Sequence, residues 1–218
     1  MVVRSFWLWQ FSFLLRHRRV RQTSYAKEVL RKRRPQLWRA DLQFLLSELP
    51  TRHANVYHSI SKDEFLGAAA RLNQQIPNLT DNQVIVEFAR LTALVGDGHT
   101  GLFFPFDDTI PFHKYPFEIW AVSDGYIVAA ASPDLTALIG KKVVRFGSED
   151  IAKVIAAVEP LAPGDNSFGK LNMALMFLPI PEVLEALGII PQAGRPLPVT
   201  VLSAGGVLQT VTLSHHSP

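Results

Sequence analysis

Residues 80–100 read TDNQVIVEFARLTALVGDGHT and contain the clearest structural pattern in the chain. Thr80, with Gln83 three residues later, has the spacing of a helix-capping box, and apolar residues then recur at helical intervals. Gly96 stands where a helix commonly ends in the left-handed conformation, which glycine adopts without strain. The stretch therefore predicts an amphipathic helix that leads into a turn at residues 97–100. The apolar stripe of this helix consists of Val84, Phe88, Leu91 and Val95.

His99 lies in that turn and is the candidate catalytic residue. Glycines on both sides of Asp97 permit a tight, exposed turn that a β-branched residue would strain. A histidine held in such a turn is placed to act as a general base. In the alternative interpretation, Asp97 or Thr100 only hydrogen-bonds the turn, and His99 fills a polar niche. The residues by themselves leave both interpretations open.

Two further amphipathic helices are expected before this one, so that residues 36–100 form a three-helix subdomain. The first ends at Pro50, because proline lacks the backbone donor that a helix needs. The second starts at Ser61, which forms another capping box with Glu64, and it ends at Pro77. The apolar stripes are Trp38, Leu42, Leu45 and Leu49 in the first helix, and Phe65, Ala69, Leu72 and Ile76 in the second.

Residues 111–214 change to the periodicity of a β-rich domain. Ser123-Asp124-Gly125 is typical of a hairpin turn, and Ser148 is placed to cap a helix that continues to Val158. Four or five strands with one or two helices predict a small α+β domain or a partly open barrel. The expected strands are 116–122, 126–131, 142–146, 197–202 and 207–213, and the later helical segments are 169–178 and 181–187.

The N-terminal arm, residues 1–35, concentrates positive charge. Residues 1–39 contain eleven Lys or Arg against one acid, a net of +10, whereas residues 40–218 contain eleven against eighteen, a net of −7. Nucleic-acid binding is therefore not expected of the body. The apolar run at residues 5–15 is shorter than the roughly 20 residues that span a bilayer. The run has the length of a signal-peptide core, but arginines follow it instead of a small-residue cleavage site, so no clear cleavable signal peptide is expected. Three interpretations stay open: a monotopic membrane anchor, an organellar transit segment, and a poorly ordered or misassigned start.

Several kinds of site are not expected. The absence of cysteine excludes disulfides, thiolate nucleophiles and cysteine-based zinc sites. His53 and His58 have neither the helical spacing nor the neighbouring acids of a metal-binding pair. Asp107-Asp108 with His113 could attract a cation, but paired acids in a loop are usually solvated. No glycine-rich phosphate loop is present either, so neither a metal nor a cofactor is predicted.

The order of these features resembles the tail-specific, or C-terminal processing, serine protease family, and especially its tricorn-core-like branch. The GDGHT run at residues 96–100 is the most specific element of the resemblance, which extends over roughly residues 36–214. It implies an α+β chain in which the three-helix subdomain precedes a small PDZ-like β-rich domain, with the catalytic α/β core missing. The other matching segments are Trp38…Asp41-Leu42, Phe65…Leu72, Asp124–Val128, Leu138–Val144 and Val199–Leu213.

The resemblance implies one catalytic role in this chain, that of His99 as general base for a serine supplied by a later core domain. Such a base takes the proton of the serine hydroxyl and returns it to the leaving amine, which suits an imidazole with an ordinary pKa of about 6.5. Residues 203–206 are typical of a hairpin turn, not of a nucleophile turn. We therefore expect the N-terminal portion of a tail-specific serine endopeptidase, inactive alone. In branches with a serine–lysine pair, His99 would be structural.

The PDZ-like module implies a second site. Such a domain adds an extended peptide as an extra strand and holds a terminal carboxylate on backbone amides, and the candidate loop is Leu138-Ile139-Gly140. The expected partners are a polypeptide substrate or C-terminal peptide, a separate chain with the catalytic core, and a membrane surface for residues 1–35; no nucleic acid is expected. The alternative function is a non-catalytic peptide-binding or membrane-associated scaffold module.

Overall fold

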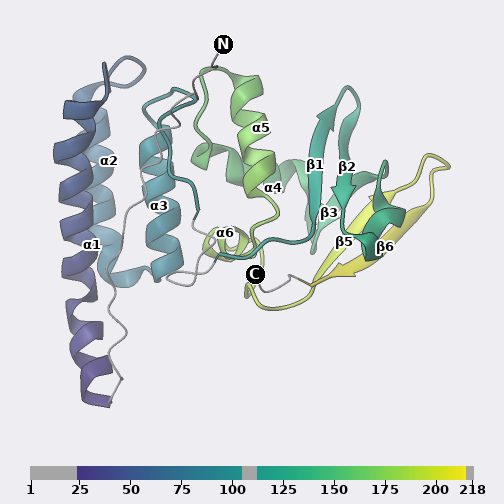
Figure 1. Ribbon diagram of the computed structural model, residues 1–218, viewed down its shortest axis with the longest axis horizontal. Coiled ribbons are helices and arrows are strands. Elements are labelled where there is room, and N and C mark those ends of the chain that lie inside the picture. Colours follow the sequence, from purple (N-terminus) through teal and green to yellow (C-terminus); the bar gives the residue numbers. More distant parts are fainter. Residues whose placement is uncertain (1–23, 105–111, 215–218) are drawn as a thin grey trace, which may run out of the picture.

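The computed structural model of the chain describes residues 24–104 and 112–214. Figure 1 shows three groups of elements side by side along the longest axis: the helices α1–α3, then the helices α4–α6, then an antiparallel sheet. The buried side chains form one continuous cluster that runs from Trp38 to Leu213. The helical and β-rich parts therefore share a single core.

The first group consists of three helices whose buried faces are the predicted stripes. All twelve predicted stripe residues are buried. Both predicted capping boxes are confirmed, at Ser61 with Glu64 and at Thr80 with Gln83. The helices are α1 (Ser24–Arg52), α2 (Lys62–Gln75) and α3 (Asp81–Ala93), with a 3-10 turn, η1 (Ile76–Asn78), between α2 and α3.

Helix α1 is longer at both ends than the sequence predicts. It begins at Ser24, inside the segment assigned to the N-terminal arm, and it continues through Pro35 and Pro50 to Arg52. The predicted end at Pro50 is wrong, because proline removes only its own hydrogen bond to the preceding turn. The amide of His53 still donates to the carbonyl of Leu49 at 3.0 Å, which completes one more turn.

The sheet is antiparallel and holds all five predicted strands plus one short addition. Its order is β1-β2-β3-β5-β6, and the two-residue β4 pairs with β3 beside this path. Strand β1 is consequently an edge strand, and it is the edge nearer to helix α5 (Figure 1). The strands are β1 (Phe117–Val122), β2 (Gly125–Ala131), β3 (Lys142–Phe146), β4 (Glu149–Asp150), β5 (Leu197–Leu202) and β6 (Leu208–Leu213), and a 3-10 segment, η2 (Pro133–Leu138), lies between β2 and β3.

The middle group joins the N-terminal helices to the sheet. Helix α4 is capped by Asp150, whose carboxylate accepts from the amide of Ala152 at 2.9 Å, so the predicted cap at Ser148 is wrong. The edge of the Phe104 ring meets Phe177 of α5 with centroids 4.9 Å apart, which ties the chain after α3 to this group. The elements are α4 (Ile151–Val158), the 3-10 turn η3 (Glu159–Leu161), α5 (Ser167–Phe177) and α6 (Pro181–Ala186).

The interpretations of the N-terminal arm concern residues that lie mostly outside the described part of the chain. Residues 1–23 are not described, and residues 24–35 belong to α1. Within the described residues, none of the helices combines the length and apolarity that crossing a membrane requires.

Candidate functional site

The turn after α3 is held by the carboxylate of Asp97. One carboxylate oxygen, Oδ1, accepts the backbone amide of His99 at 2.6 Å and that of Thr100 at 2.8 Å. Gly96 precedes it with a φ of +79°, the left-handed conformation that the sequence predicts there. Asp97 thus folds the chain around its own side chain, and the backbone position of His99 follows from it.

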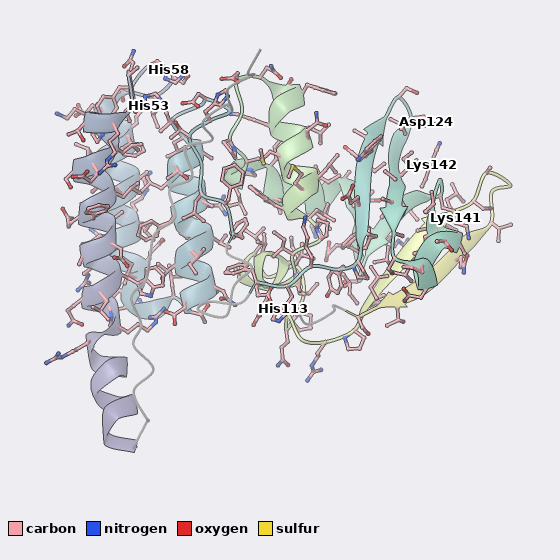
Figure 2. The ribbon with its side chains drawn as sticks, in the orientation of Figure 1. His53, His58, His113, Asp124, Lys141 and Lys142 are labelled. Carbon is pink, nitrogen blue, oxygen red and sulfur yellow. The ribbon has the colours of Figure 1, made fainter. Side chains whose placement is uncertain are left out.

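His53, just beyond the C-terminal end of α1, holds the other oxygen of the same carboxylate. Its Nδ1 accepts the amide of Asn55 at 3.0 Å, so its proton resides on Nε2, which donates to Oδ2 of Asp97 at 2.7 Å. The ring of His58 stacks on that of His53 with centroids 6.1 Å apart and an interplanar angle of 9°. Figure 2 shows the two histidines together at one end of α1.

These contacts keep Asp97 ionised. Burial acts to raise the pKa of Asp97, but the hydrogen bond from His53 and those from the turn outweigh it and lower the pKa from 3.8 to about 2. Only 16% of the Asp97 side chain and 19% of the His53 side chain are exposed. The turn is therefore built on a shielded, charge-assisted hydrogen bond.

The loop that follows η3 holds the turn from the opposite side. The amide of Gly98 donates to Oδ1 of Asp165 at 3.1 Å. A Cβ at Gly98 would lie 2.9 Å from Oδ2 of Asp165, and one at Gly101 would lie 2.6 Å from Cγ of Pro163. The close approach of this loop to the turn therefore favours glycine at both positions, in addition to the backbone flexibility that glycine gives the turn.

The side chain of His99 stays available within this frame. The residue is exposed, and neither ring nitrogen has a hydrogen-bond partner among residues 24–104 and 112–214. It borders a cavity of about 170 Å³, and no serine is among the described residues that line this cavity. The lining residues are Leu49, Arg52, His53, Ala54, Asp97, His99 and Thr100. An imidazole so placed can accept a proton from a group that enters the cavity.

No pattern in the sequence predicts the role of His53. No cluster of acids lies near it along the chain, and its partner Asp97 is 44 residues away. The pairing depends on the extra turn of α1 beyond Pro50, and no linear spacing marks it. Among the described residues, the structure gathers no group of three or more side chains able to hold a metal ion.

His113 belongs to a separate cluster at the start of α6 (Figure 2). Its Nδ1 lies 2.5 Å from Oε1 of Glu182, and its amide donates to Oε2 at 2.9 Å. Burial, and then the charge of Glu182, raise the pKa of the neighbouring Tyr115 to about 12. Asp107 and Asp108, the other members of the candidate cation site, lie outside the described residues.

The candidate peptide loop, Leu138-Ile139-Gly140, lies far from His99. It begins at the last residue of η2 and precedes Lys141 and Lys142, which Figure 2 labels at the sheet end, opposite to His53. The amide of Ile139 donates to Thr136 O at 3.1 Å, and that of Gly140 donates to Val128 O at 2.8 Å. A carboxylate would have to compete with these bonds. Peptide binding at this loop stays a prediction.

A larger groove lies instead along the edge strand β1. It has a volume of about 510 Å³ and runs between β1 and α5. Three large apolar side chains that border it are exposed: Trp120 by 63%, Phe168 by 68% and Met176 by 55%. An edge strand also leaves alternate backbone N–H and C=O groups without a strand partner. The sequence reasoning did not predict this groove, which needs α5 to pack beside β1.

The described elements have a fold like that of part of a solved peptidase. Structures that they resemble include those of CPAF, a chlamydial serine protease of the tail-specific protease-like class. Mature CPAF complexed with lactacystin aligns with a TM-score of 0.61 at 16% identity, and mature CPAF alone with 0.60 at 17%. A serine-to-alanine variant of CPAF aligns with 0.59 at 15%.

Each of these alignments covers 86% of this chain and 35% of the CPAF chain, so the chain spans about a third of CPAF. At such low identity the likeness shows the fold alone, and it gives no support to the tricorn-core-like branch in particular. No model of a known protein family matches the chain. No curated protein matches it either.

Proposed function

We propose that this chain is the N-terminal portion of a tail-specific serine endopeptidase in which His99 is the general base. The observation that supports this most strongly is the contrast between backbone and side chain at His99. The backbone is fixed by Asp97, whereas the exposed imidazole borders a cavity with both ring nitrogens unbonded among the described residues. A catalytic base needs this combination of fixed position and free nitrogen.

The serine comes from an α/β core outside these 218 residues, in the same polypeptide or in a second one. Its hydroxyl enters beside His99, which removes the proton as the oxygen attacks the peptide carbonyl. The imidazolium then gives that proton to the leaving amine, and a water repeats the two transfers to release the acyl group. Asp97 forms no hydrogen bond with the imidazole of His99; its described bonds go to His53 and to backbone amides. No acid is bonded to this imidazole among the described residues, and we place the acid that stabilises the imidazolium in the core with the serine.

The test uses the protein purified under native conditions from its own organism with a tag on this chain, so that the core is retained whether it is bound or continuous with the chain. Hydrolysis of fluorogenic peptides is measured for the wild type, for His99→Ala and for His58→Ala as a matched control. We expect His99→Ala to lower kcat/KM by at least about 100-fold, while His58→Ala leaves it nearly unchanged. Full activity of His99→Ala would refute the assignment.

A second candidate function, a peptide-binding module, is favoured by the groove between β1 and α5. An extended peptide could pair with the free edge of β1 and place alternate apolar side chains against Trp120 and Phe168. Titration with apolar peptides, followed by Trp120 fluorescence, tests this. We expect a saturable change that Phe168→Ala weakens and that Leu208→Ala, an exposed change at the opposite sheet edge, does not. No saturable change would remove the second candidate.

A further inference from the structure

We infer that His53 is a positioning residue for His99 and acts through the carboxylate of Asp97. The inference rests on the proposed role of His99 as general base. His53 would then have a functional role that no spacing of residues in the sequence predicts. Hydrogen bonds link the end of α1 to the backbone of the turn.

The first step is that His53 has a defined orientation. The Asn55 amide occupies its Nδ1, which leaves the Nε2 proton directed at Asp97. The neighbouring His58 ring stacks on His53 but forms no described hydrogen bond with it; its own Nδ1 donates to Asn55 O at 2.9 Å. A ring flip of His53 would break both of its hydrogen bonds at once, so one ring orientation is favoured.

The second step is that Asp97 divides its two oxygens between two parts of the molecule. Oδ2 faces His53 at the end of α1, and Oδ1 faces the amides of His99 and Thr100. The two oxygens belong to one rigid planar group, so a hydrogen bond at Oδ2 restricts the rotation that would carry Oδ1 away from the turn. His53 therefore determines where the turn closes, and through the turn it determines the backbone position of His99.

The third step is that the contacts of the η3 loop cannot replace this anchor. Asp165 binds the amide of Gly98 but does not contact the carboxylate of Asp97 in any described bond. Without His53, Oδ2 of Asp97 is free to turn toward solvent in the cavity and to loosen the two bonds at Oδ1. Misplacement of a catalytic group by about 1 Å lowers turnover on the order of 100-fold.

The test compares His53→Leu, which removes both ring nitrogens, with His53→Gln, whose side-chain amide can still donate to Asp97. His58→Leu is the matched control, because it removes the stacked ring and leaves the bond to Asp97. The first readout is hydrogen exchange of the His99 and Thr100 amides in this chain. We expect His53→Leu to speed exchange of these two amides about 10-fold or more, and the other two variants to change it little. Unchanged exchange in His53→Leu would overturn the inference.

The second readout is peptide hydrolysis by the natively purified complex. His53→Leu should lower kcat by about 10- to 100-fold with KM unchanged, and His53→Gln should recover most of the loss. If His99→Ala abolishes activity while His53→Leu keeps full kcat, the inference is overturned and the proposed function stands. If His99→Ala is fully active, the proposed function fails, and with it the role assigned to His53. Amide exchange then still shows whether His53 holds the turn.

Discussion

Replacing Asp97 by asparagine should destabilise the fold and also remove part of its acid sensitivity. The asparagine carbonyl can still accept the amides of His99 and Thr100. Its NH₂ group, however, would face the Nε2–H of His53, so two donors would meet where a donor and an acceptor meet now. If the His53 proton moved to Nδ1, Nε2 could accept from the asparagine NH₂ group. The Nδ1–H would then face the backbone N–H of Asn55, which is also a donor.

The size of the pH-dependent part follows from the pKa of Asp97, which falls from 3.8 to about 2 on folding. Each pKa unit corresponds to about 1.4 kcal/mol, so ionisation of Asp97 stabilises the fold by about 2 kcal/mol. Because the pKa is lowered, this stabilisation is fully present above the unfolded pKa. It is lost as the pH falls through the folded pKa, mainly between about pH 5 and about pH 2.

The assay is urea unfolding followed by far-ultraviolet circular dichroism at a series of pH values. The difference in unfolding free energy between the wild type and Asp97→Asn should be constant above about pH 5 and should shrink by about 2 kcal/mol toward about pH 2. Asp63→Asn, at an exposed carboxylate in the first turn of α2, is the control for loss of a surface charge. A difference that does not depend on pH would refute the reasoning.

Three further predictions concern the elements that support the site, each checked by urea unfolding. Gly101→Ala should lower the free energy of unfolding by about 1–3 kcal/mol, because its Cβ would meet the rigid ring of Pro163. Gly194→Ala is the control, since its Cβ would enter open space and should change little. Equal effects of the two changes would count against the close approach of Gly101 and Pro163. Thr80→Ala should cost about 1 kcal/mol by removing the cap of α3. Phe146→Ala should cost about 3–5 kcal/mol, since the ring of this last residue of β3 is fully buried in the core.

Most of the secondary structure could be predicted because local patterns determine it. The capping box at Thr80 and the stripe that follows it place α3, and the glycine at position 96 marks the end of its last turn. The strands were found from alternation and from hairpin turns such as Ser123-Asp124-Gly125. Where two residues of similar capping ability stand close together, local reasoning failed: Asp150 caps α4 instead of Ser148, after β4 pairs with β3.

The site itself could be predicted only at His99, because its geometry depends on long-range contacts. The His53–Asp97 bond requires α1 to run past Pro50, which the rule for proline in helices argued against. The contacts of Gly98 with Asp165 and of Gly101 with Pro163 join segments more than 60 residues apart. The groove beside β1 likewise forms from α5, whose position no pattern in β1 indicates.

The central claim is that His99 activates a serine of an α/β core, and labelling of that serine tests it most directly. The natively purified protein is treated with a fluorophosphonate, which reacts only with an activated serine, and the labelled residue is identified. We expect rapid labelling of the core serine in the wild type and in His58→Ala, and loss of labelling in His99→Ala. Labelling of His99→Ala at the wild-type rate would contradict it.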